Sequence, residues 1–414
     1  MSDRLFIVPN FSKNNYSYDE LIKFVNEHGN EPGLCINDAD PFIFFSKLLT
    51  GLVNRKEITL FDVDFSSTEI TRLAGAEAEK GQTLQTNHPR QFQTIDDLLS
   101  TLNEIECSRI NIFTSGTTGL PKKVTHSLSS LTRNIRVSDH HKKDIWGLSY
   151  SPSHMAGLQV FFQALYNKNP LVQLLGKNRI EVVRSVETHK ITHLSATPSF
   201  YRLLIPCEKP LTSVRSLTSG GEIFSETIRI ELERIFPNAR FHNIYASTEA
   251  GSLLEAGGEF FEVPVGLKKL LRIIKDELCI HKSLLGEFSV STLKGNWYHT
   301  NDIVGLVQKK PLKFRFVSRK NEIINVGGFK VNPHEVEETL LQMAGIKDAW
   351  VFGKRNSVLG HILVCEIVTS EPGINELAVR EWLSIRLQNF KIPRLCKFVE
   401  SIEQTKTGKK KRDQ

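Results

Sequence analysis

The hydrophobic and polar positions from Arg109 onward alternate between two kinds of segment. Short runs rich in β-branched and apolar residues are separated by longer helix-like stretches, such as Arg179–Lys190 and Ser225–Phe236. The short runs are Ile110–Thr114, Leu171–Leu175, Thr192–Ala196, Arg215–Thr218 and Phe241–Tyr245. This alternation predicts a layered α/β domain with mainly parallel strands. Polar turn clusters follow several of the runs, at the edge where α/β sheets usually bind ligands.

The pattern changes near Arg319. A helix is expected to begin at Pro333, followed by two strand-like runs, Asp348–Phe352 and Ile362–Val368, and by a second helix. The residues expected on the inner faces of the two helices are Val336, Leu340 and Met343 in the first and Ala378, Trp382 and Ile385 in the second. We therefore predict a large α/β domain over residues 1–318 and a small, mobile α+β domain over residues 319–414.

The charge of the chain does not favour a nucleic-acid partner. The formal net charge is +7, but the last eleven residues carry five basic residues and one acid, which leaves +3 for the rest of the 414 residues. A nucleic-acid-binding protein is expected to carry a basic stripe across a folded face. The interpretation as such a protein therefore rests on the tail charge alone.

The cysteines and the apolar segments indicate a protein of the cytoplasm. The six cysteines are widely spaced and form no C-x-x-C pair, which argues against a disulfide framework or a zinc site and favours a reducing compartment. Residues 1–15 lack the pattern of a signal peptide. The most apolar stretch, Pro41–Val53, is too short to span a bilayer.

The segment from Ile112 to Lys123 (IFTSGTTGLPKK) carries the clearest candidate chemistry. Its hydroxyl groups, its glycines and a lysine at 122 or 123 are what a polyphosphate needs, because glycine lets backbone N–H groups turn toward an anion. The segment is not a Walker loop, since the G-x-x-x-x-G-K-[ST] spacing is absent. The alternative interpretation is a polar surface turn.

This segment resembles the phosphate-loop signature of the adenylate-forming superfamily of acyl- and aryl-CoA synthetases, luciferases and peptide-synthetase adenylation domains. Further segments resemble the motifs of that superfamily in the right order, so the resemblance covers nearly the whole chain. They are Tyr245-Ala-Ser-Thr-Glu249 for Y-G-x-T-E, His299-Thr-Asn-Asp302 for T-G-D, Arg319–Glu337 for the hinge segment, Thr405–Arg412 for the terminal T-x-x-G-K-x-x-R, and, more weakly, Tyr18–Leu21, Gly220-Gly221-Glu222 and Pro264–Gly266.

The resemblance implies a function: ATP and Mg²⁺ activate a carboxylic acid as an acyl-AMP, and the acyl group then passes to a thiol. It implies that the phosphate loop cradles the ATP phosphates through Thr114, Ser115, Gly116, Thr117, Thr118, Gly119 and Lys122. Tyr245 would stack on adenine, Thr248 would bind a phosphate oxygen, and Glu249 would hold Mg²⁺, which prefers oxygen ligands. Without the resemblance, Tyr245 would be a core residue and Glu249 a solvated side chain.

The resemblance implies three more nucleotide contacts. Asp302 would accept the ribose hydroxyls, and Arg319 would reach the ribose and phosphate region. Lys409 would reach the carboxylate and the α-phosphate and offset the charge that develops there. The alternatives are a surface ion pair for Asp302 and Arg319 and a solvated basic tail for Lys409.

Ser151-Pro-Ser-His-Met-Ala-Gly157 resembles the P-x-x-H-x-x-G segment of many acyl- and aryl-CoA synthetases. His154 would line the wall between the acid pocket and the thiol tunnel, or it is a core histidine. Amino-acid-activating relatives usually place an Asp near this segment, and none lies between Ser149 and Val160. We therefore expect an acid without an α-amino group.

Coenzyme A is the expected thiol, because Gly327 and Gly328 match the glycine loop that lines a pantetheine tunnel. The pantetheine arm of an acyl carrier protein is the closest alternative, and a non-catalytic nucleotide-binding protein on the same fold is another. The chain departs from the family at Ala246, Asn301 and Asn321, the last of which lies at the expected hinge. The N-terminal region is expected to be shortened, and the sequence leaves open whether the chain forms a homodimer.

Overall fold

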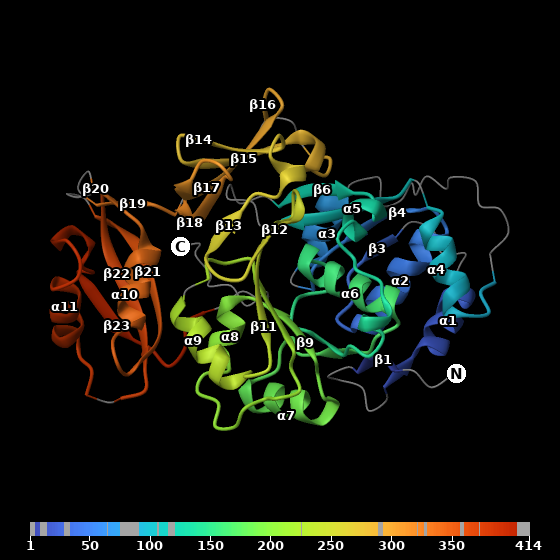
Figure 1. The fold of residues 1–414 in the computed structure, drawn as a ribbon, viewed down its shortest axis with the longest axis horizontal. Helices are drawn as coiled ribbons and strands as arrows, with labels where there is room; N and C mark the ends of the chain where they lie inside the picture. The colour runs from blue at the N-terminus through green and yellow to red at the C-terminus, as the bar shows by residue number, and fades with distance from the viewer. Residues whose placement is uncertain are drawn as a thin grey trace.

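The computed structural model describes residues 5–8, 15–28, 34–63, 65–74, 91–105, 107–114, 121–224, 226–288, 293–320, 322–326, 329–356, 360–371 and 373–403. These residues form four sheets and the helices that pack on them (Figure 1).

The largest sheet has eight strands in the order β12-β11-β10-β9-β7-β8-β1-β2. Its six inner strands pair in parallel, and the two edge strands, β12 and β2, pair antiparallel. The strands are β1 (Leu5–Val8), β2 (Tyr16–Ser17), β7 (Trp146–Leu148), β8 (Leu171–Gln173), β9 (His193–Ala196), β10 (Ser216–Gly220), β11 (Arg240–Ser247) and β12 (Gly251–Ala256). The helices that follow or join them are α6 (Met155–Asn167), α7 (Arg179–His189), α8 (Pro198–Leu203) and α9 (Glu226–Ile235).

The second sheet has four strands in the order β3-β4-β5-β6 and lies beside the first in the N-terminal half (Figure 1). Its strands are β3 (Leu34–Ile36), β4 (Glu57–Leu60), β5 (Arg109–Thr114) and β6 (Lys122–His126). Its helices are α1 (Tyr18–Glu27), α2 (Pro41–Val53), α3 (Ser67–Ala74), α4 (Ile95–Asn103) and α5 (Leu128–Thr132). The apolar stretch Pro41–Val53 is α2, a crossover helix whose phenylalanines and leucines fill the core. No helix among the described residues is both long and apolar enough to cross a membrane.

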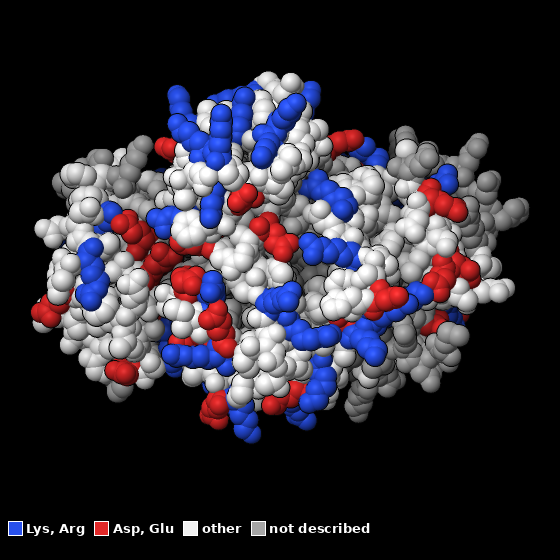
Figure 2. Space-filling view, in the orientation of Figure 1, with Lys and Arg blue, Asp and Glu red and all other residues white. Residues whose placement is uncertain are grey.

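The third sheet is antiparallel, and the long hairpin of β17 and β18 forms its centre. Its strands are β13 (Phe260–Glu262), β14 (Leu271–Ile274), β15 (Glu277–His281), β16 (Leu293–Lys294), β17 (Trp297–Gln308) and β18 (Lys313–Arg319). Figure 2 shows lysines and arginines gathered over β14–β16 at the top of the molecule, whereas the rest of the visible face is mixed in sign. The small net charge of the chain therefore conceals a locally basic surface, which the sequence analysis did not foresee.

The fourth sheet forms the C-terminal α+β unit. Its strands are β19 (Ile324–Val326), β20 (Phe329–Val331), β21 (Ile346–Asn356), β22 (Gly360–Thr369) and β23 (Leu395–Phe398), and its helices are α10 (Pro333–Leu341) and α11 (Glu376–Ser384). Asn332 links this unit to β18 through a 2.8 Å hydrogen bond from its side-chain amide to the carbonyl oxygen of Val317.

The elements predicted from the pattern are confirmed, but both helices end before the last residue expected on their inner faces. Met343 follows α10, which ends at Leu341, although it still packs against the core of this unit. All five short runs are strands, the two helix-like stretches are α7 and α9, and α10 begins at Pro333. The inner face expected for α11 is wrong at Ile385, which follows the helix and is 81% exposed. The buried residues of α11 are Val379 and Leu383, one position after Ala378 and Trp382. Trp382 misled the prediction because its ring packs at the edge of this core while its indole N–H reaches the carbonyl of Thr339.

The hydroxyl of Tyr201 ties α8 to two neighbouring strands of the large sheet. It lies 3.0 Å from the carbonyl oxygen of Leu194 and 2.8 Å from that of Thr218, and the side chain is fully buried. We expect Tyr201→Phe to lower the free energy of unfolding by about 1–2 kcal/mol, because two buried carbonyl groups lose the one hydroxyl proton that they share while the ring packing stays. Urea unfolding measures this change. Tyr166→Phe, at a half-buried tyrosine, is the control, and an equal loss in both variants would contradict the assignment.

Candidate active site

The carboxyl ends of three parallel strands place several motif residues at one edge of the large sheet. β9, β10 and β11 are neighbours in register, and each is followed by a polar segment: Thr197 after β9, Gly221 and Glu222 after β10, and Thr248 and Glu249 after β11. Parallel pairing forces these segments to the same edge, where α/β sheets bind ligands. The expectation drawn from the strand pattern thus holds for the position of these residues.

Glu249 forms a partly buried ion pair with Lys122. The Lys122 Nζ atom lies 3.4 Å from Glu249 Oε1, and the hydroxyl of Tyr298 donates a 2.9 Å hydrogen bond to the same oxygen. The ammonium of Lys122 also lies 3.8 Å from the centre of the Phe288 ring. Burial opposes ionisation of Glu249, but the charge of Lys122 and the hydrogen bonds outweigh it and lower the pKa of the carboxyl. The carboxylate is therefore held in its charged form.

A histidine at the end of β6, His126, fixes the turn that carries Thr248 and Glu249. His126 lies 2.7 Å through Nε2 from the carbonyl oxygen of Thr248 and 3.0 Å through Nδ1 from the hydroxyl of Ser130. Because a carbonyl only accepts, Nε2 carries the proton and Nδ1 accepts from the serine. Gly286 lies so close that an added Cβ would sit 2.7 Å from the His126 ring and from a backbone oxygen. Sequence analysis missed His126, which lies at the end of the β6 run.

Asp302 on β17 lies between two donors, Tyr245 on β11 of the large sheet and Arg319 on the neighbouring strand β18. The hydroxyl of Tyr245 donates a 2.6 Å hydrogen bond to Asp302 Oδ2, and Arg319 Nε donates a 2.8 Å bond to Oδ1. Burial, and then the charge of Asp302, raise the pKa of Tyr245 well above its ordinary value, so its hydroxyl keeps the proton that it donates. The Tyr245 ring stacks on Phe316 with ring centres 4.4 Å apart. These three motif residues, predicted separately, are brought together.

Asn301 adopts a left-handed backbone with φ of 62°, directly before Asp302. The family usually has glycine here, and asparagine is among the few other residues that tolerate this region. Its backbone N–H donates to Glu277 Oε1 at 2.8 Å. Ala246 also replaces a family glycine, but its φ is not left-handed, so alanine fits. Both departures are therefore compatible with the local backbone.

His154 is the N-cap of α6 and faces a carboxylate that the sequence analysis missed. Its Nε2 lies 3.1 Å from Asp62 Oδ2, and the hydroxyls of Ser151 and Ser153 donate to the same oxygen at 2.6 and 3.0 Å. Asp62 follows β4, about ninety residues earlier in the chain, so no local motif signals it. Burial acts to raise the pKa of Asp62, but His154 and the two serines outweigh burial and lower it to about 2.

Gly157 explains the last position of the P-x-x-H-x-x-G segment. An added Cβ would overlap the backbone carbonyl oxygen of Ser151. The first turn of α6 therefore packs directly on the chain that carries the two serines. A side chain at 157 would push the segment apart and displace His154 from Asp62.

Glu222 caps the other helix at this edge. It accepts from the backbone N–H of Ser199 at 3.0 Å and from the Ser199 hydroxyl at 2.8 Å, at the start of α8. Gly221 before it has φ of 83°, a conformation that favours glycine, and an added Cβ at Gly220 would lie 3.1 Å from the carbonyl oxygen of Ile244. The local backbone alone therefore explains why both residues are glycine, independently of any ligand.

Several predicted site residues lie outside the described residues: Ser115, Gly116, Thr117, Thr118, Gly119, Asn321, Gly327, Gly328 and Lys409. Thr114 ends β5 and is the register partner of Lys122 on β6, so the two ends of the phosphate loop lie side by side. Tyr298 is a further residue that sequence analysis missed. The alternation along β17, in which Tyr298, Thr300 and Asp302 are all buried, is the signal that could have found it.

Comparison with known proteins places the chain in a family. A model of the AMP-binding enzyme family matches residues 35–266, and a model of the AMP-binding enzyme C-terminal domain matches residues 335–409. The first match covers more than half of the chain. The chain therefore belongs to the AMP-binding enzyme family.

Among curated relatives, the 4-hydroxybutyrate–CoA ligase 1 of Metallosphaera sedula is 25% identical over 351 residues, which cover 73% of this chain and 61% of that protein. The 4-coumarate–CoA ligase CCL1 of Humulus lupulus is 25% identical over an alignment that covers 72% of this chain and 62% of that protein. The chain thus spans less than two thirds of the length of these relatives. The 2-succinylbenzoate–CoA ligase of Staphylococcus aureus is 23% identical over an alignment that covers 93% of this chain and 82% of that protein.

Solved structures share the fold over almost the whole chain. The o-succinylbenzoate CoA synthetase of Bacillus subtilis, in complex with an acyl-adenylate, aligns with a TM-score of 0.70 and 17% identity, covering 98% of this chain and 94% of that one. The anthranilate CoA ligase AuaEII, in complex with anthranoyl-AMP, aligns with a TM-score of 0.74 and 16% identity, covering 99% and 92%. At this level of identity the likeness shows the fold.

The Asp62 network should make stability depend on pH in the acid range. Because the folded-state pKa of Asp62 is about 2, against an ordinary value near 4, its contribution is complete above about pH 4 and is lost as the pH falls through about 2. We expect Asp62→Asn to lower the free energy of unfolding by about 2 kcal/mol at neutral pH. The difference from wild type should shrink as the pH falls from about 4 to 2.

Urea unfolding at several pH values measures this difference. Ser153→Ala, which removes one donor and keeps the carboxylate, is the matched variant and should lose less. A constant difference between wild type and Asp62→Asn over the acid range would show that the carboxylate charge does not stabilise the fold.

Proposed function

We propose that this protein is an ATP-dependent acid–thiol ligase, which activates a carboxylic acid as an acyl-AMP and transfers the acyl group to coenzyme A. The observation that carries the proposal is the convergence of motif residues at the sheet edge. The Lys122–Glu249 pair and the Tyr245–Asp302–Arg319 group come from distant segments and lie together there, with the Asp302 carboxylate buried and the other side chains partly exposed. Family membership and the CoA-ligase names of the relatives support the same activity.

The nucleotide would bind beside Asp302. An ionised carboxylate has about four acceptor positions, and among the described side chains Tyr245 and Arg319 donate to one oxygen each. The carboxylate can therefore accept ribose hydroxyls without losing its neighbours. The adenine would lie against Tyr245, whose other ring contact is Phe316. Thr248 would contact a phosphate oxygen, and Gly220, Gly221 and Glu222 would line the base and ribose region.

Glu249 fits a magnesium ion. Its carboxylate is kept ionised beside Lys122 and Tyr298, and Mg²⁺ is typically bound by one or two carboxylates together with substrate phosphates and water. When bound, the ion would neutralise charge on the polyphosphate. Lys122 is already within reach of the same carboxylate, and with residues 114–119 it would hold the phosphate chain.

In the first half-reaction a carboxylate oxygen of the acid attacks the α-phosphorus of ATP. The bond to the β-phosphate breaks, and pyrophosphate leaves with the electron pair. Lys409 would hold the attacking carboxylate and the α-phosphate and offset the charge that gathers between them. In the second half-reaction the thiol sulfur attacks the acyl carbon, the thiol proton is lost, and AMP leaves.

The acid is expected to be an aryl or short-to-medium acyl acid without an α-amino group. Among the described residues, Asp62 lies against the Ser151–Gly157 segment, and its Oδ2 atom contacts three side chains of that segment. This carboxylate is therefore engaged in holding the wall, which supports a pocket without an ammonium-binding acid. His154 would stand at the boundary between acid and thiol.

A screen of carboxylic acids for pyrophosphate and AMP formation tests the activity. We expect release with at least one aryl or acyl acid, and a thioester only when coenzyme A is added. A carrier protein bearing pantetheine, tested as the acceptor in parallel, separates the two thiols. Pyrophosphate release that is strongest with a standard amino acid would contradict the proposed substrate class, and no release with any acid would favour a non-catalytic binding protein.

Lys409→Ala should nearly abolish acyl-AMP formation and largely spare thiolysis of a supplied acyl-AMP. The reason is that the ammonium offsets the charge that forms when the carboxylate attacks the α-phosphorus, whereas thiolysis attacks the acyl carbon and needs a different face of the small domain. Pyrophosphate release and thioester formation are measured separately. Lys411→Ala, in the same basic segment, is the control and should keep both rates. Equal loss of both half-reactions in a variant with an unchanged melting temperature would refute the division of roles.

We also propose that the C-terminal domain, residues 319–414, rotates about Asn321 between the half-reactions. Lys409 serves the first, and the Gly327–Gly328 loop would line the pantetheine tunnel in the second. Hinges are a few residues that absorb large φ/ψ changes, and proline fixes φ. Asn321→Pro should therefore leave one half-reaction near its normal rate and slow the other by orders of magnitude. A folded variant that runs both at wild-type rates would exclude this hinge.

A further inference from the structure

A group of three ligand-type side chains lies at the opposite edge of the large sheet from the candidate active site. His141 ends the short helix η2 (Asp139–His141), Asp144 lies in the turn before β7, and His193 is the first residue of β9. Trp146 and His193 are register partners at the amino ends of their strands. Because the strands are parallel, this group and the residues that follow the carboxyl ends occupy opposite edges.

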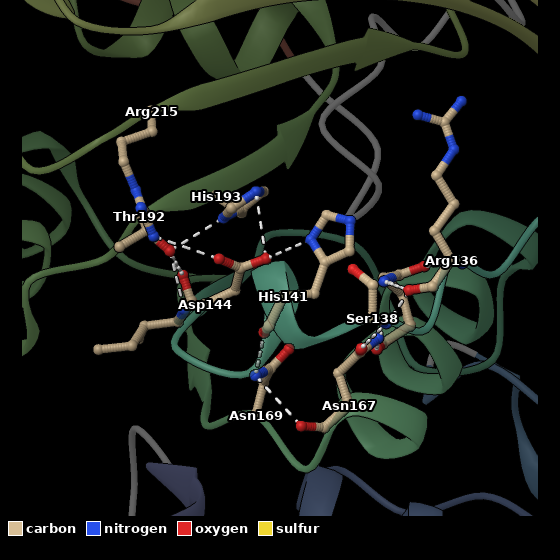
Figure 3. Close-up of polar contacts among 11 residues, drawn as sticks. Arg136, Ser138, His141, Asp144, Asn167, Asn169, Thr192, His193 and Arg215 are labelled. Atoms are coloured by element: carbon tan, nitrogen blue, oxygen red, sulfur yellow. Dashed lines mark hydrogen bonds and ion pairs between the residues drawn. The ribbon is translucent and has the colours of Figure 1, made fainter.

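The carboxylate of Asp144 sits between the two imidazoles. Asp144 Oδ2 is 2.7 Å from His141 Nδ1 and 3.5 Å from His193 Nε2, and the three atoms all lie within 4.8 Å of one another. Asp144 is 2% exposed, so the carboxylate is enclosed. Figure 3 shows the two rings approaching it from different sides, while Arg215 approaches the other carboxylate oxygen. No other group of this kind occurs among the described residues.

These distances are close to those of a metal-ligand set. Zinc bonds of 2.0–2.1 Å to nitrogen and oxygen in a tetrahedron separate neighbouring ligand atoms by about 3.3 Å. The His193–Asp144 distance of 3.5 Å already fits, and the His141–Asp144 distance of 2.7 Å would have to open by about 0.6 Å. The side chain of His141 is 22% exposed, so water can reach a fourth position.

Groups around the two histidines favour the ligating arrangement. Thr192 Oγ1 lies 2.9 Å from His193 Nδ1, accepts from the backbone N–H of Ile145 at 2.8 Å and lies 3.2 Å from the carbonyl oxygen of Ile145. When the threonine donates to that carbonyl, it accepts from Nδ1–H, and the lone pair of Nε2 points to the cluster. Asn169 donates to the backbone carbonyl of His141 at 2.9 Å and fixes that turn. Such outer contacts orient metal-binding histidines.

The contact between His193 and Asp144 is not an ordinary hydrogen bond, although His141 and Arg215 each lie within hydrogen-bond distance of the carboxylate. With the proton of His193 on Nδ1, its Nε2 lone pair and the Asp144 carboxylate are two acceptors facing each other across 3.5 Å. With the proton on Nε2, the same 3.5 Å is longer than an ordinary N–H···O bond. A cation between the two atoms would satisfy both.

We propose that His141, Asp144 and His193 form a binding site for a first-row divalent transition-metal ion, with Zn²⁺ as the representative ion. Two imidazoles and one carboxylate suit zinc, nickel or copper rather than the oxygen-preferring Mg²⁺ or Ca²⁺. The ion would join the turn before β7 to the start of β9 and stabilise this edge of the sheet. The cysteine spacing that argued against a zinc site concerned thiolate ligands only, and this set has none.

A substitution of Arg215 should have opposite effects on the stability of the metal-free protein and on its affinity for the metal. Its Nη2 lies 3.2 Å from Asp144 Oδ1, and the side chain is 51% exposed. The guanidinium stabilises the buried carboxylate when no ion is bound and repels a divalent ion. Arg215→Gln should therefore lower the melting temperature of the metal-free protein and tighten metal binding, two changes that a purely structural ion pair would not produce together.

The experiment uses the full chain after chelator dialysis. Co²⁺ is titrated while its visible absorption is recorded, because a tetrahedral site gives stronger bands than the aqueous ion, and Zn²⁺ is then added as a competitor. We expect one ion per chain, and a rise in melting temperature with Zn²⁺. His193→Gln and His141→Gln should each weaken binding at least about tenfold. His140→Gln, at an exposed neighbour whose ring centre is 5.4 Å from that of His141, should bind as wild type does.

The proposal is overturned if the wild type binds no stoichiometric ion at micromolar concentration, or if His193→Gln and His140→Gln bind equally. If a histidine variant does not fold, the Arg215→Gln comparison still decides, because weaker or unchanged metal affinity there contradicts a cation beside Asp144. None of these readouts involves ligase activity, so the result stands apart from the function proposed above.

Discussion

Parallel pairing of β9, β10 and β11 is the constraint on which the arrangement of this protein depends. Three strands that run in the same direction end at one edge, and the chain must turn there three times. Those turns hold Ser199 against Glu222, and Glu249 against Lys122, in a region closed by the third sheet through Tyr298 and Asp302. Separate polar segments therefore form one site, because parallel strands bring the segments that follow them to the same edge of the sheet.

The acidic side chains of this site lie beside basic side chains that offset their charge. Each carboxylate has a basic partner and a hydroxyl donor: Lys122 and Tyr298 for Glu249, Arg319 and Tyr245 for Asp302. A buried charge without such partners would be neutralised by a shifted pKa. Asp62 with His154 and Asp144 with Arg215 are paired in the same way. The carboxylates named here therefore have basic partners before any ligand binds.

The sequence predicted what is local and missed what is long-range. Strand runs, the start of α10 at Pro333 and the motifs around Glu249 and Asp302 are encoded within a few residues, so pattern alone found them. Asp62 and His126 could not be found in this way, because their partners lie far along the chain. The imidazole of His154 is 92 residues from Asp62, and the backbone carbonyl of Thr248 is 122 residues from His126. The prediction for Ile385 is wrong for a different reason: the helical spacing continues to this residue in the sequence, but α11 ends at Ser384 and Ile385 is exposed.

The contact between Gly157 and Ser151 limits how this scaffold can change its acid. Helix α6 contacts the backbone of the serine segment directly at Gly157, with no side chain between them. No side chain at this contact can therefore be exchanged for a larger or smaller one. Substitutions elsewhere can deepen or narrow a pocket by exchanging one side chain for another, whereas here any added atom moves the main chain. A change in the size of the acid, whether by evolution or by engineering, must therefore come from substitutions in the other walls of the pocket. The residues of this turn can change only together.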